Sequence, residues 1–121
     1  HFRTGEVLRP LREEGVLIFG SGNVVHNLAL ASPRQAGGFP WAAEFDAYIK
    51  TSLLSGNPEA LIRFEAAGPS AGRAFYTTEH YVPLLVAAGA ADGQDKIHVF
   101  NEACVMGAIS MTGYLFHGER A

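Results

Sequence analysis

GVLIFGSGNVVHN, residues 15–27, contains the pattern from which the fold is predicted. Residues 15–20 form a short, continuous apolar run bounded by glycines. A run that is apolar on both faces is typical of a strand buried within a parallel sheet. The turn-rich residues 21–27 then lead out of that strand. The sequence therefore predicts a central strand at 15–20, buried on both faces, with helices packed against its sheet.

The remainder of the chain carries helical patterns first and strand patterns after them. Apolar residues spaced by three or four predict an amphipathic helix that ends at Gly56. Asn57 followed by Pro58 is typical of the cap and first position of a second helix. The expected elements are helices over 41–54, from 58, and from 79 to about 88, and strands over 96–100 and 108–116. This order predicts an α/β fold with a mixed, mostly parallel sheet flanked by helices.

Composition limits the classes of protein to which the chain can belong. Its 121 residues are 48% apolar and 17% charged, which suits one domain with a buried core. The formal net charge of −3 argues against a nucleic-acid partner, and the apolar stretches are too short to span a membrane. Cys104 is the only cysteine, which excludes an internal disulfide and a Cys-rich zinc site. With a charged N-terminal stretch unlike a signal peptide, these features predict a cytoplasmic protein.

Two of the five histidines occur where active sites are commonly built. His26 lies in the loop beyond the predicted strand, where ligands of open α/β sheets bind. His80 lies in TTEHY at a predicted helix start, beside Glu79. Imidazole and carboxylate groups are ligands of Fe(II) and Zn(II), so these residues are candidates for a metal site. The alternative is that each is an ordinary capping or surface residue, since two histidines so far apart in sequence are not a motif.

The GSGNVV segment, residues 20–25, has two alternative interpretations. Gly20 and Gly22 match the first two positions of the dinucleotide fingerprint, but Val25 occupies the third. A tight turn that needs two glycines explains the segment more simply. A small-molecule-binding domain that uses this turn for an anion is a further hypothesis.

Four blocks of sequence point to a known family: GVLIFGSGNVVHNL (15–28), WAAEFDAYIK (41–50), ALIRFEAAGPSAGRAFYTTEHYVPLLVAAGAA (60–91) and GAISMTGYLF (107–116). Together they resemble the C-terminal half of the class III extradiol ring-cleavage dioxygenases, particularly the DOPA-dioxygenase-like branch. Members of that family are about twice as long as this chain, and their N-terminal half supplies further metal-binding histidines. The resemblance therefore implies that residues 1–121 are the C-terminal portion of a dioxygenase catalytic domain.

The resemblance also implies roles for individual residues. His26 matches a histidine that lies at the metal in the DOPA-type branch and resembles the acid–base residue in protocatechuate-type enzymes. His80 matches a metal ligand of the DOPA-type branch, and Glu79 is the alternative carboxylate ligand. The implied metal is Fe(II), with Zn(II) as the alternative, and the implied reaction opens a catechol ring with O2 beside the two hydroxyls. This chain has Phe75-Tyr76 where the family has a histidine followed by a proline.

The same resemblance suggests what else the chain interacts with. The expected partners are a catecholic substrate and the N-terminal half of the same protein, with a homo-oligomer as a further expectation. The surface where that half docks should be an apolar patch next to His26. A zinc-dependent hydrolase, or a non-catalytic metal-binding module on the same scaffold, is the alternative function.

Overall fold

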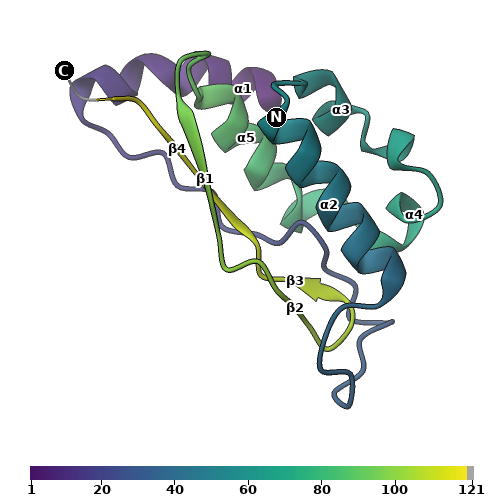
Figure 1. Ribbon diagram of the computed structural model, residues 1–121. Coiled ribbons are helices and arrows are strands. Elements are labelled where there is room, and N and C mark those ends of the chain that lie inside the picture. The colour runs from purple at the N-terminus through teal and green to yellow at the C-terminus, as the bar shows by residue number, and fades with distance from the viewer. Residues whose placement is uncertain (120–121) are drawn as a thin grey trace.

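The computed structural model describes residues 1–119, in which the helices lie together on one side of a long β-hairpin (Figure 1). The hairpin pairs β1 (Lys96–Phe100) with β4 (Gly113–His117), and a smaller sheet pairs β2 (Cys104–Val105) with β3 (Ile109–Ser110). Both pairings are antiparallel. The predicted combination of helices and strands is confirmed, whereas the prediction of a mostly parallel sheet is wrong. The strand expected at 108–116 is divided between β3 and β4.

The helices follow the predicted patterns closely where local signals are strong. The helical elements described are α1 (Phe2–Leu8), η1 (Arg9–Glu14), α2 (Pro40–Leu54), α3 (Pro58–Ile62), η2 (Phe64–Ala67), α4 (Ala71–Ala74), η3 (Thr78–His80) and α5 (Val82–Ala90), where η denotes a 3-10 helix. The Asn57 side chain accepts from the backbone N–H of Ala60, as expected for the cap of α3. The third predicted helix begins later than expected because Pro83, which lacks an N–H, fits only in the first turn of α5. Among residues 1–119, no helix combines the length and the hydropathy needed to cross a bilayer.

Residues 15–20 are not the buried central strand that the sequence predicts. They follow an elongated path outside the sheets, and the side chains of Leu17 and Phe19 are 77% and 81% exposed. The buried segment comes later, at Val24 and Val25, and His26 forms single bridges to Phe75 and Ile109. A strand that is apolar on both faces needs neighbours to cover it, and the described residues leave 15–20 without them.

An aromatic cluster forms the centre of the core. Phe45 of α2 is fully buried, and its ring lies 5.8 Å from Phe75 and 6.2 Å from Tyr81 between centroids. Phe64 completes the cluster at 5.2 Å from both Phe75 and Tyr81. The Tyr81 hydroxyl donates to the carbonyl oxygen of Leu61 at 2.6 Å, and burial raises the pKa of this phenol. The cluster therefore joins α2 to Phe75, which bridges to His26, and to Tyr81, which directly follows His80.

A partly buried ion pair joins η1 to the residues before β1. The two terminal nitrogens of Arg12 donate to the two carboxylate oxygens of Asp95 at 2.6 and 3.0 Å, and the Asp95 side chain is 4% exposed. Burial alone would raise the pKa of Asp95. The hydrogen bonds from Arg12 and from the Asp92 backbone, together with the charge of Arg12, lower it below its ordinary value.

This ion pair is expected to make the stability of the chain depend on pH. Because the folded state favours the ionised carboxylate, the stabilisation is present above the ordinary pKa of about 4 and is lost as pH falls through the lower folded-state value. We expect the wild type to lose more unfolding free energy in urea than Asp95→Asn between about pH 6 and pH 2. Glu13→Gln, at an exposed carboxylate, should behave like the wild type. Equal losses in the wild type and Asp95→Asn would contradict this prediction.

Candidate metal centre

His26 and His80 lie in direct contact. The centroids of the two imidazole rings are 3.6 Å apart, and the ring planes are inclined by 19°. Both side chains are half-buried, so each ring is partly accessible to solvent. The structure thus brings together the two histidines that the sequence selects as candidates.

Backbone hydrogen bonds hold His26 between two other segments. The N–H of His26 donates to the carbonyl oxygen of Ala74 at 2.7 Å, and the N–H of Ser110 donates to that of Val25 at 2.9 Å. The buried side chain of Asn27 donates to the carbonyl oxygen of Arg73 at 2.8 Å. Residues 25–27 are therefore hydrogen-bonded to segments on both sides, with single bridges from His26 to Phe75 and Ile109, although the sequence predicts a turn there. The signal that sequence reasoning missed is Asn27, whose amide can bond backbone groups in irregular segments.

Two glycines bring the loop of His26 against the segment of His80. A Cβ atom at Gly22 would lie 2.1 Å from the carbonyl oxygen of His80, and one at Gly20 would lie 2.6 Å from that of Pro83. The N–H of Asn23 also donates to the His80 carbonyl at 2.8 Å. The glycines are thus required by close backbone approach. The groups at this approach are carbonyl oxygens, which repel an anion, so the geometry disfavours the anion-binding hypothesis.

Asp46 of α2 connects the core to the strands that hold His26. Its carboxylate accepts hydrogen bonds from the hydroxyls of Ser110 and Thr112, the latter at 2.9 Å. The side chain of Asn23 donates to the Ser110 carbonyl oxygen at 2.8 Å. This network links α2, the end of β3 and the loop before His26. Sequence reasoning did not select Asp46, because nothing local indicates that two distant hydroxyls meet it.

Glu79 is exposed on η3, next to His80. Hydrogen bonding by the Thr77 side chain and by the backbone of Glu79 lowers the pKa of its carboxyl group, and the nearby imidazoles add to this effect. The group is therefore a carboxylate at neutral pH. Because Glu79 is exposed, its carboxylate is available as a ligand. The observed contact, however, is between His26 and His80, and Glu79 takes no part in it.

The donor types fit Fe(II) or Zn(II), but the described residues do not complete a site. Among residues 1–119, no group of three His, Cys, Asp or Glu side chains is arranged to hold a metal ion. His26 and His80 are thus two adjacent nitrogen donors that need at least one further ligand.

The remaining candidate residues lie on other elements. His98 is exposed on β1, and His117 is exposed at the end of β4. Cys104 is half-buried in β2, where burial raises the pKa of its thiol and disfavours the nucleophilic thiolate. These residues therefore do not extend the pair formed by His26 and His80.

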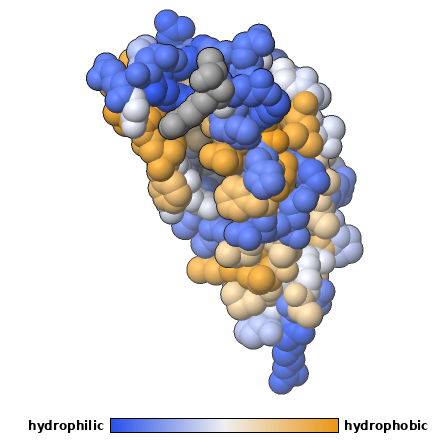
Figure 2. Space-filling model, turned by 60° about the vertical axis from the view of Figure 1, so that its left-hand side comes forward, coloured by the Kyte–Doolittle hydropathy of each residue, from blue (hydrophilic) through white to orange (hydrophobic). Residues whose placement is uncertain are grey.

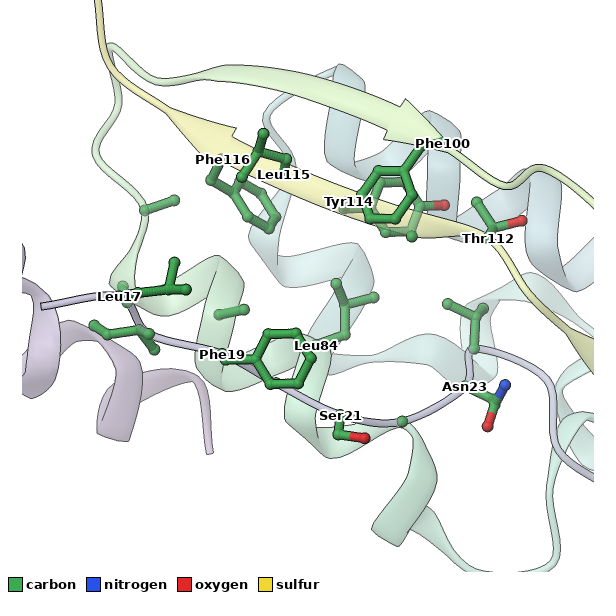
Figure 3. A pocket seen from close by; sticks show the side chains of 18 of the residues that line it. Leu17, Phe19, Ser21, Asn23, Leu84, Phe100, Thr112, Tyr114, Leu115 and Phe116 are labelled. Carbon is green, nitrogen blue, oxygen red and sulfur yellow. The ribbon is translucent and has the colours of Figure 1, made fainter. Parts of the chain in front are cut away.

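An apolar groove runs beside His80. Its cavity of about 520 Å³ lies between residues 16–24 and β4, with Leu84 of α5 in its lining (Figure 3). Figure 2 shows a hollow in one face of the molecule with hydrophobic surface on both sides. The sequence predicts an apolar patch next to His26. The groove has His80, which contacts His26, in its lining, and it lies between two extended segments.

Comparison with known proteins identifies the family. The family model described as the catalytic LigB subunit of aromatic ring-opening dioxygenase matches residues 1–117. The chain belongs to this family. Membership in the LigB family confirms the resemblance to extradiol dioxygenases that the four sequence blocks carry.

Individual relatives of the LigB type support the same assignment. A protein named 4,5-DOPA dioxygenase extradiol from Beta vulgaris is 37% identical over 96% of this chain and 43% of its own length. One of the same name from Escherichia coli K12 is 38% identical over 92% of this chain and 42% of its length. A crystal structure of an uncharacterized protein from Escherichia coli K12 matches 94% of this chain with 36% identity and a TM-score of 0.84, over 48% of that chain. The chain therefore spans less than half the length of these relatives.

Proposed function

We propose that this chain is the C-terminal portion of a dioxygenase catalytic domain that opens the ring of a catechol beside its hydroxyls. The observation that carries the proposal is the contact between His26 and His80, which places two metal-binding side chains together. Membership in an aromatic ring-opening family supports the reaction class. The relatives named 4,5-DOPA dioxygenase make DOPA the first substrate to test.

His26 and His80 would hold the metal, with Glu79 as the alternative carboxylate ligand. We favour Fe(II) over Zn(II), because the bound metal would supply coordination sites for catechol and O2, and zinc has no redox chemistry. The third ligand would come from a part of the protein outside this chain, since the described residues offer no complete group.

Proton transfer is the chemistry that the histidine pair itself can perform. An imidazole is well suited to accept a proton from a catechol hydroxyl near neutral pH and to return it later. In this proposal His26 does so through a ring nitrogen if it is not itself a ligand. Its backbone bonds to Ala74 and its stacking on His80 hold the ring in place for that transfer.

The cellular setting belongs to the same proposal. We place the protein in the cytoplasm, where its single thiol at Cys104 stays reduced. A homo-oligomer is compatible with this arrangement. The direct partner in the proposal is the segment that the relatives have outside the matched region.

The isolated chain is expected to lack activity. With two adjacent nitrogen donors only, it should bind Fe(II) substoichiometrically and consume no O2 when DOPA is added. Co-expression with the unmatched portion of the Escherichia coli relative should restore about one iron per complex and uptake of one O2 per DOPA. The measurements are metal analysis and an oxygen electrode.

Two results would contradict this assignment. If the isolated chain bound stoichiometric iron and turned over DOPA, this chain would contain a complete site. That site would then lie away from the pair of His26 and His80. Tight zinc without O2 uptake in the co-expressed complex would favour the hydrolase or metal-binding alternative.

A further inference from the structure

The groove beside His80 has two extended walls. Residues 16–22 form one wall and β4 forms the other, while Leu84 and Ala87 of α5 lie in the lining between them. In Figure 3, Leu17 and Phe19 lie across the groove from Tyr114 and Phe116. The cavity of about 520 Å³ is therefore bordered by backbone on both long sides.

The backbone of both walls is incompletely hydrogen-bonded. β4 pairs with β1 along one edge, and no described strand pairs with its other edge. Within residues 1–119, the backbone groups of 17–22 form no hydrogen bond with other backbone groups. Unpaired edges of this kind are templates for another strand.

The side chains of the walls are apolar and exposed. Leu17 is 77% exposed, Phe19 is 81% exposed, and Leu115 of β4 is 45% exposed. A segment with apolar side chains on both faces is typical of the interior of a covered sheet, but here it meets solvent. Exposed apolar residues along two facing edges indicate a surface that is covered in the assembled protein.

We propose that a β-strand from the part of the protein outside this chain inserts into the groove and pairs with residues 16–22 on one edge and β4 on the other. This would join two separated edges into one continuous sheet, with α5 covering one face. His80 lies in the lining of the groove, so the inserted strand would also shield the histidine pair from solvent. The inference rests on the fold and on the extent of the relatives, and does not depend on the catalytic proposal.

The length of the relatives identifies the source of the strand. The chain covers 43% of the Beta vulgaris relative and 48% of the matching solved chain, so each has more than half of its residues available elsewhere. A second copy of this chain is less suitable. Each of its described strands, β1 to β4, already has one edge occupied by its partner, whereas the groove requires a strand with two free edges. Its unpaired residues 17–22 already form a wall of its own groove.

Binding of the unmatched segment tests the proposal directly. The probe is the portion of the Escherichia coli relative outside the match, co-expressed with the 121-residue chain and captured through a tag on that portion. Phe19→Asp should weaken the complex at least about tenfold, because it removes a ring that the complex would bury and places a charge in the interior of the completed sheet. Val7→Asp is the matched control, since Val7 is 72% exposed on α1 and lies outside the groove. It should leave binding within about twofold.

Hydrogen exchange locates the contact. Amides of residues 17–19 should exchange at least about 100-fold more slowly in the complex than in the free chain. Equal unfolding midpoints of the two free variants would show that Phe19→Asp acts on binding and not on folding. A complex that tolerates Phe19→Asp, or that leaves amides 17–19 unprotected, would overturn the proposal. So would a homodimer that Phe19→Asp abolishes while the segment does not bind, because the occupant would then be a second copy.

Discussion

Replacing His26 by alanine is expected to lower the rate of catechol cleavage by the co-expressed complex about 10²–10⁴-fold. The reason is that His26, in contact with His80, is in the proposal either a metal ligand or the group that moves the catechol proton. Replacing His80 by alanine should lower the rate to a similar degree and should also remove the metal, because it breaks up the pair of adjacent imidazoles that would hold the ion. Oxygen uptake with DOPA measures the rates.

Metal analysis of the same variants separates the two roles of His26. Retention of iron with loss of turnover would assign His26 to proton transfer, whereas loss of both would assign it as a ligand. His98→Ala is the control, because His98 is exposed on β1 and should leave rate and metal content unchanged. Full activity in either His26→Ala or His80→Ala would refute the proposed site.

Phe45→Ala is expected to reduce the free energy of unfolding by about 3–5 kcal/mol. Phe45 is fully buried, and its ring contacts those of Tyr48, Phe64, Phe75 and Tyr81. Truncation removes the transfer free energy of the ring and leaves a cavity that the surrounding aromatic rings fill incompletely. Urea unfolding of the isolated chain, followed by circular dichroism, measures the change.

Leu54→Ala provides the control for this substitution. Leu54 ends the same helix and is 53% exposed, so its truncation should cost less than about 1 kcal/mol. The effect of Phe45→Ala should also reach the metal centre, because Phe75 packs on Phe45 and bridges to His26. Similar costs for the two variants would mean that the aromatic cluster is not the centre of the core.

Local sequence patterns determined the elements that depend on few neighbours. The helix at 41–54 was predicted because its apolar residues recur every three or four positions, and α2 buries Phe45 and Ile49 on that face. Asn57 and Pro58 predicted the start of α3, since a cap and a first-turn proline act within one turn. The strand that local strand signals predict at 96–100 is confirmed as β1.

The sequence also determined the family and the choice of His26 and His80. The blocks GSGNVVHN and TEHYVPLL carried that resemblance, and the match over residues 1–117 confirms the family. The reason Gly22 is required was not evident from the sequence. It depends on the carbonyl oxygen of His80, which is far away along the chain.

Only the tertiary structure decided where the predicted central strand lies and what surrounds it. The composition of residues 15–20 indicates a strand buried on both faces, yet Phe19 is 81% exposed and the segment lacks a ladder among residues 1–119. Burial of a strand depends on neighbours from elsewhere in the protein, and hydrophobicity alone cannot supply them. The contact between His26 and His80 likewise depends on backbone bonds between distant segments, such as that from the N–H of Asn23 to the carbonyl oxygen of His80, which no local pattern relates.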